Sequence, residues 1–107
     1  MFAKEPEVEH WHEAKDGPLN EANMRKKLAA QGYKAIKYVF PPGTDFPDHS
    51  HNETKKDAII EGQFRFAMLG KEVILQPGDI VEVPGGVNHN ATVVSSEPVV
   101  FFDTTRS

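Results

Sequence analysis

The sequence contains no cysteine, and this absence limits both the folds and the metal sites that the chain can form. Without thiols no disulfide can cross-link the fold, and nothing requires an oxidising compartment. Any bound metal must therefore be held by nitrogen and oxygen ligands. We expect a cytoplasmic protein.

Long apolar runs and an excess of positive charge are also absent. No apolar stretch approaches the roughly eighteen residues of a membrane span, and the first ten residues are charged rather than typical of a signal peptide. The net charge of −4 disfavours nucleic acid as a partner, because its phosphate backbone selects a basic face. We therefore expect no membrane and no nucleic-acid partner. The length of 107 residues indicates one domain with one core.

Residues 1–32 are expected to form an arm and a helix within that domain. Residues 1–17 show no sustained period, which is typical of an arm rather than a packed element. The single tryptophan, Trp11, is flanked by His10 and His12. We expect the arm to lay Trp11 over an apolar surface and to leave both histidines in solvent.

The one helix that the pattern predicts spans residues 19–31. Asn20 is a suitable N-cap, and Gly32 can adopt the left-handed conformation that often follows a helix. Met24 and Leu28 are four residues apart and form a narrow apolar stripe. This stripe predicts that the helix packs against the rest of the domain.

From Tyr33 onward the apolar pattern changes to a period of two. Short strands are predicted at residues 36–40, 58–60, 63–68, 72–75, 80–83, 89–94 and 99–103. Turn signals rich in glycine and proline separate them, and no helical pattern recurs between them. Short strands with such regular punctuation indicate an all-β sandwich or barrel over residues 33–107.

Two stretches contain histidines in patterns that favour metal binding. His49 and His51 lie two residues apart, so on a strand their side chains point to one face with Cα atoms roughly 6.6 to 6.8 Å apart. The spacing alone is not specific, because His10 and His12 repeat it. Further along, a proline–glycine turn at residues 84–86 leaves His89 at the head of the next strand.

Together these stretches resemble the two sequence motifs of the cupin superfamily. In the first motif a glycine precedes a His-x-His pair, a glutamate and a second glycine; in the second, a glycine precedes Pro-x-Gly and a histidine. The matching residues are Gly43, His49, His51, Gly62, Gly78, Pro84, Gly86 and His89. The resemblance covers residues 33–103 and implies an all-β double-stranded β-helix, or jelly-roll barrel, with the one short N-terminal helix beside it.

The resemblance also implies a metal site inside the barrel. In cupins the His-x-His pair, the first-motif glutamate and the second-motif histidine usually hold one metal, so His49, His51 and His89 are expected to bind a divalent zinc, nickel, manganese or iron ion. The chain departs from the family at two positions. Lys55 stands where the glutamate is expected, and Val93 replaces the final asparagine of the second motif.

Lys55 leaves three arrangements open. Glu53 or Asp57 could supply the missing carboxylate, since Asp57 is in phase with position 55 on the next strand. Alternatively Lys55 pairs with Asp57 and leaves a site of three histidines with open positions. In the third arrangement Lys55 extends to solvent and no metal binds tightly.

Two classes of function remain open for such a barrel. It could be a metal-dependent enzyme acting on a small oxygen-containing substrate, or a module that binds a small molecule without turning it over. Lys55 favours an anionic ligand in either class. The apolar run at residues 99–102 exceeds what one small core needs, which predicts a homodimer.

Overall fold

The computed structural model describes residues 6–106. Residues 1–5 of the predicted segment 1–32 and residue 107 of the predicted segment 33–107 lie outside this range. In chain order the elements are β1 (Val8–Glu9), α1 (Glu13–Asp16), α2 (Glu21–Ala30), β2 (Tyr33–Phe40), β3 (Asp45–His49), β4 (Lys55–Glu61), β5 (Phe64–Met68), β6 (Lys71–Leu75), β7 (Ile80–Val83), β8 (His89–Val93) and β9 (Val99–Arg106). Strand is the dominant element, as the alternating pattern predicted.

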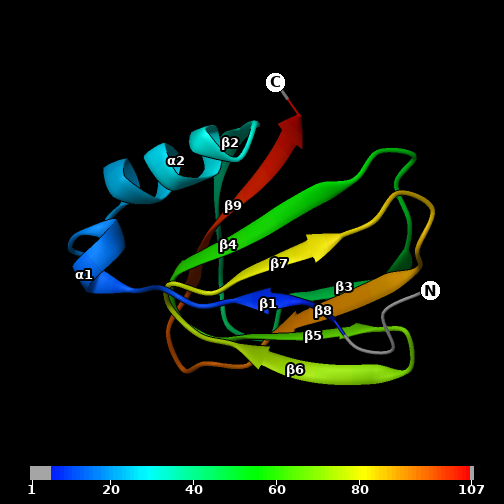
Figure 1. The fold of residues 1–107 in the computed structure, drawn as a ribbon. Helices are drawn as coiled ribbons and strands as arrows, with labels where there is room; N and C mark the ends of the chain where they lie inside the picture. The colour runs from blue at the N-terminus through cyan, green and yellow to red at the C-terminus, as the bar shows by residue number, and fades with distance from the viewer. Residues whose placement is uncertain (1–5, 107) are drawn as a thin grey trace.

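The strands form two antiparallel sheets that face each other (Figure 1). Sheet A has the order β1-β7-β4-β9-β2, and sheet B has the order β3-β8-β5-β6. Apart from the β5–β6 hairpin, neighbours in each sheet are far apart in the sequence, which is the arrangement of a double-stranded β-helix. Within residues 6–106 no ladder of paired strands joins the two sheets into the closed barrel that was predicted.

The predicted helix is present as α2. The Asn20 side chain accepts a hydrogen bond of 2.8 Å from the backbone N–H of Asn23, and Gly32 follows with a φ of 89°. Met24 and Leu28 are fully buried, so the apolar stripe docks as expected. Neither of the two helices within residues 6–106 is long and apolar enough to cross a membrane.

The prediction of a single helix was wrong, because the structure has a second one, α1. It contains four residues, and none of them is buried. His12 occupies its N-cap position without a side-chain cap. One turn of helix is too short to establish a period of 3.6, so the sequence pattern did not reveal it.

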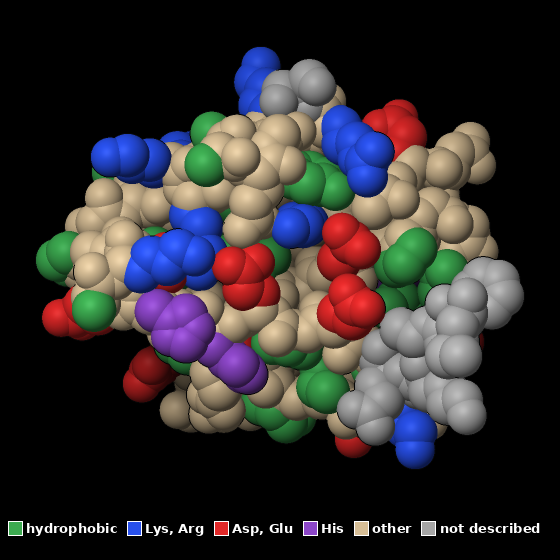
Figure 2. Space-filling view, in the orientation of Figure 1, with side chains coloured by type: hydrophobic (Ala, Val, Ile, Leu, Met, Phe, Trp, Pro, Cys, Tyr) green, Lys and Arg blue, Asp and Glu red, His purple; other side chains and the backbone are tan. Residues whose placement is uncertain are grey.

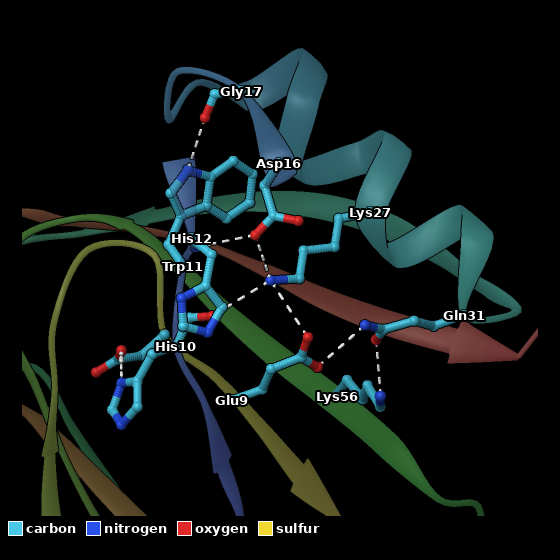
Figure 3. A network of polar contacts seen from close by, with 10 residues as sticks. Glu9, His10, Trp11, His12, Asp16, Gly17, Lys27, Gln31 and Lys56 are labelled. Carbon is cyan, nitrogen blue, oxygen red and sulfur yellow. Dashed lines mark hydrogen bonds and ion pairs between the residues drawn. The ribbon is translucent and has the colours of Figure 1, made fainter. Parts of the chain in front are cut away.

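The N-terminal arm is packed against the sheet rather than lying loose. β1 pairs with β7 at the edge of sheet A, and Trp11 lies against the residues under α2. A Cβ added at Gly78 would approach the Cβ of Trp11 to 2.5 Å, so the glycine permits this close contact. The buried Lys27 ammonium bonds Asp16 at 2.8 Å and Glu9 at 3.2 Å, which ties the arm to α2 (Figure 3).

Two apolar clusters stabilise the domain, one on each face of sheet A. The larger lies between the sheets and includes Phe101, whereas the smaller lies under α2 and includes Phe102. The apolar run at residues 99–102 is therefore largely used within this chain, because β9 is covered on both faces. On the face shown in Figure 2, Lys and Arg side chains are interspersed with Asp and Glu, and no extended basic area is visible there.

Candidate metal centre

The structure brings three of the five histidines together on sheet B. His49 ends β3 and His89 begins β8, and the two are paired across the ladder. His51 follows in the loop after β3. Each can offer one ring nitrogen such that all three nitrogens lie within 4.8 Å of one another. Within residues 6–106 this is the one group of three or more potential ligand residues of this kind.

An irregularity in β3 sets the direction of these side chains. Phe46 and His49 are three residues apart, so a regular strand would turn them to opposite faces. The ladder with β8 shifts its register between these two residues, and both line the same cavity. Pro47 lies within the shift, where an edge strand tolerates the missing N–H. This bulge was not predicted from the sequence.

The second-motif turn holds the His51 loop in place. The backbone N–H of Gly86 donates to the carbonyl of His51 at 2.7 Å, and the N–H of Gly85 donates to Thr54 Oγ1 at 3.1 Å. A Cβ on Gly85 would lie 2.5 Å from the carbonyl oxygen of Asn52, so a larger residue would push the two loops apart. The glycines of this turn therefore position a histidine that is 35 residues earlier in the chain.

Hydrogen bonds to the backbone fix the orientation of two of the rings. His49 Nδ1 lies 2.8 Å from the carbonyl of Pro47, and His89 Nδ1 lies 3.0 Å from the carbonyl of Val87. Because a carbonyl only accepts, each Nδ1 must carry the proton. The Nε2 lone pairs are then free, which is the arrangement that metal-binding histidines usually show.

Burial and neighbouring charge favour the neutral form of His51 and His89. Burial lowers the pKa of His51, and the positive charge of Lys55 and then His49 lower it further. Burial likewise lowers the pKa of His89, with His49 and His51 adding to the effect and the Val87 hydrogen bond opposing it. Neutral imidazole is the form that binds metal, so this donor set fits a divalent transition ion.

The three histidines form part of the wall of a cavity of about 260 Å³ between the two sheets. Sheet B contributes the histidine side of this cavity, and sheet A contributes two carboxyl groups from β4 and β9. The remaining wall is apolar and mainly aromatic. The lining residues are Tyr38, Phe40, Phe46, His49, His51, Asp57, Phe64, Phe66, His89, Ala91, Phe101 and Asp103. This volume lies below the roughly 300 to 1,000 Å³ of pockets for drug-sized ligands, so a bound molecule must be small.

The candidate carboxylates and Lys55 occupy different places from one another. Glu53 is exposed in the loop before β4 and does not line the cavity. Asp57 lines the cavity from sheet A, but it is not part of the histidine group. Lys55 Nζ pairs with Asp103 Oδ2 at 3.2 Å, rather than with Asp57 as one of the three arrangements proposed.

Asp103 is the residue of this region that the sequence analysis did not single out. It lies on β9 and shares its inward phase with Phe101, so both side chains line the cavity. An acidic residue directly after the apolar run at residues 99–102, in phase with Phe101, was the available signal. The run of apolar residues before it drew attention to dimerisation instead.

The second His-x-His pair lies outside the cavity. His10 Nδ1 contacts Asp79 Oδ1 at 2.7 Å, and His12 is exposed at the start of α1. Figure 3 shows both residues in the N-terminal network, beside Trp11. Within residues 6–106 neither of these two histidines belongs to the group of three potential metal ligands, and that they bind no metal stays a prediction.

The chain thus combines the strand order of a double-stranded β-helix with three histidines at the wall of a small, mainly apolar cavity. Comparison with family models identifies a cupin domain over residues 36–105. The chain therefore belongs to the cupin family, as the two motifs implied. No curated protein matches this chain.

Solved structures agree with this assignment. An RmlC-like cupin from Shewanella frigidimarina is 27% identical with a TM-score of 0.60, and the match covers 68% of this chain and 64% of that one. KdgF from Halomonas sp. is 21% identical with a TM-score of 0.61, over 71% of this chain and 70% of that one. The cupin domain of Cnp3 from Schizosaccharomyces pombe is 16% identical with a TM-score of 0.64, over 71% and 53%. The last two show the fold alone, and the chain spans less than two thirds of the first and third of these structures.

Proposed function

We propose that this cupin is a metal-dependent enzyme that acts on a small oxygen-containing, anionic molecule. His49, His51 and His89 would hold one divalent zinc, nickel, manganese or iron ion. The observation that carries the proposal is the convergence of three imidazoles at the wall of a small apolar cavity. Imidazole nitrogen is a suitable ligand for zinc, nickel and iron, whereas manganese prefers oxygen ligands. Because several ions fit, the ion bound in the cell also depends on which metal is available.

A metal held by three protein ligands keeps coordination positions open, and it can polarise or orient an oxygen of the substrate there. The chain supplies the surroundings of that chemistry. Aromatic side chains from both sheets restrict water and limit the size of the molecule that enters. Lys55 adds positive charge beside the histidines, which favours an anionic ligand even though Asp103 partly neutralises it.

Elemental analysis of untagged protein tests the metal centre. We expect close to one equivalent of a transition metal after purification or after reconstitution of the metal-free protein. Replacing His89 by Ala should remove most of it, and replacing both His10 and His12 by Ala should not. Less than a tenth of an equivalent in the reconstituted wild type would refute the metal centre.

A non-catalytic binding module is the second candidate, and the lysine at position 55 favours it. Among residues 6–106 no carboxylate joins the three histidines, so this part of the site differs from the family pattern in charge as well as in ligand number. Incubation of the metal-loaded protein with small hydroxy and oxo acids, followed by NMR of the mixture, separates the candidates. Loss of a compound with appearance of a product supports the enzyme, and line broadening without turnover supports the module.

We also propose a homodimer in solution. The edge strand β2 of sheet A exposes Ile36 and Val39, each about half accessible. An exposed apolar edge strand is a surface that native proteins usually cover. Three of the four residues at 99–102 are buried within the chain, so the exposed edge strand is the feature that supports this proposal.

A further inference from the structure

We propose that Asp57 and Asp103 form a carboxyl pair that shares one proton, and that this pair is a second polar site in the cavity, which donates a hydrogen bond or a proton to an oxygen of the bound ligand. The role toward the ligand rests on the proposed function, because it requires a molecule between the pair and the histidines. The pair itself requires no metal and can be tested separately.

The fold places the two carboxyl groups next to each other. Asp57 on β4 and Asp103 on β9 are direct Cα partners in the antiparallel ladder of sheet A. Side chains of directly paired residues stand on the same face of a sheet, a few ångströms apart. Both line the cavity, and the histidines line it from sheet B. A ligand in this space therefore has the histidines on one side and the carboxyl pair on the other.

The surroundings of Asp57 require a proton. Its Oδ1 atom is shielded from solvent and has no hydrogen-bond partner, which is costly for a charged oxygen. The Asp103 carboxyl group is its direct cross-strand neighbour, but two ionised carboxylates only accept and cannot bond each other. One proton on the pair supplies the missing donor. Burial raises the pKa of Asp57 well above its usual value, and the negative charge of Asp103 raises it further.

Lys55 decides which member of the pair keeps the proton. Its ammonium bonds Asp103 Oδ2 at 3.2 Å and so gives Asp103 a donor, whereas Asp57 Oδ1 has none. Asp57 then carries the proton and donates to Asp103, and an oxygen of a bound ligand would replace Asp103 as the acceptor. The other groups that face the pair are Val81, the apolar neighbour of Asp57 on β7, and the histidines across the cavity. The negative charge of Asp103 raises the pKa of His51 and of His89 and so partly offsets the effect of burial.

The pair defines the chemical class of ligand that fits. Beyond the histidines and these two carboxyl groups, the described lining is apolar apart from the tyrosine ring of Tyr38. A molecule with one oxygen directed at the histidines and a second oxygen on its opposite side would satisfy both sites. In a transfer step the proton leaves the Asp57 carboxyl group and bonds the ligand oxygen, and Asp57 becomes a carboxylate.

Infrared difference spectroscopy tests whether the pair holds a proton. We expect the carbonyl stretch of a protonated carboxyl group at neutral pH, shifted in D₂O, in both metal-free and metal-loaded wild-type protein. The band should be lost in Asp57→Asn and retained in Asp45→Asn, a control at an exposed position of β3. Absence of the band, or its retention in a folded Asp57→Asn protein, would overturn the proposal. A protein that fails to bind metal but shows the band refutes only the proposed function.

A small diazo ester, ethyl diazoacetate, tests whether the proton is available to a molecule in the cavity. A protonated carboxyl group gives its proton to the diazo carbon, nitrogen gas leaves, and the carboxylate oxygen bonds that carbon. We expect one ester on Asp57 or Asp103, located by peptide mass spectrometry, and at least a tenfold lower yield in Asp57→Asn. The Asp45→Asn control should be labelled like the wild type. Labelling only at other carboxyl groups would show that the pair is sealed and would refute the ligand site.

Discussion

Replacement of His89 by Ala should remove the stabilisation that a bound metal gives to this fold. A ligand at one hundred times its dissociation constant stabilises the native state by about 2.7 kcal/mol. For a domain of this size each kcal/mol corresponds to roughly 4–8 °C in Tm, so the metal should raise Tm by roughly 10–20 °C. Loss of a group that hydrogen-bonds a metal ligand already weakens metal binding roughly 10 to 100-fold, and loss of the ligand itself should cost at least as much.

A roughly 100-fold loss of affinity raises the dissociation constant until it equals the metal concentration. The stabilisation by the metal is then only about 0.4 kcal/mol. The metal-dependent shift in His89→Ala should therefore fall to a few degrees. The variant also loses the bond from its Nδ1 to the Val87 carbonyl, worth about 0.5–1.5 kcal/mol, so its metal-free Tm falls as well. The quantity to compare is the shift on adding metal, not Tm itself.

Thermal unfolding with and without zinc, nickel, manganese or iron(II) measures this shift, and calorimetric titration measures the affinity directly. His12→Ala is the matched control, because His12 is exposed and lies outside the cavity. An equal shift in His89→Ala and wild type would show that the metal binds elsewhere. No shift with any ion in the wild type would refute the metal centre.

Four further predictions follow from the same residues. The pKa values of His51 and His89 are lowered from 6.5, so both rings are neutral at pH 7. The stability due to the neutral rings is present above pH 6.5 and is lost as the pH falls through the lowered pKa values. Calorimetry should show the metal affinity falling in the same pH range. The pKa of Asp57 is raised from 3.8, so the stability that its protonated form contributes is complete below pH 3.8 and is lost as the pH rises through the raised pKa. Urea unfolding should therefore show Asp57→Asn gaining stability relative to wild type as the pH increases. Lys55→Glu exchanges a repulsive charge near the metal for an attractive one, so metal affinity should rise several-fold; an unchanged or weaker affinity by calorimetry would show that the charge at this position does not act on the metal. Light scattering at micromolar concentration should give a dimer mass, and Ile36→Glu on the exposed edge strand should shift it toward the monomer; a wild-type monomer would contradict the dimer.

The sequence determined the features that depend on short-range patterns. Period-two alternation after Tyr33 predicted a β-rich domain, because strand side chains alternate between faces. Asn20 and Gly32 located the ends of α2, because capping is a local property of the backbone. The cupin motifs located His49, His51 and His89, which the structure then brought together on sheet B.

Tertiary structure decided the other half of the cavity. The carboxyl pair exists because β4 pairs with β9, and the register of that ladder places Asp57 opposite Asp103. Lys55 bonds Asp103, which is 48 residues away in the sequence, rather than Asp57, which is two residues along the same strand. Burial and long-range strand pairing determine these contacts and the protonation of Asp57. Neither can be predicted from the local spacing of residues, so only the folded chain shows that the histidines face a pair of carboxyl groups.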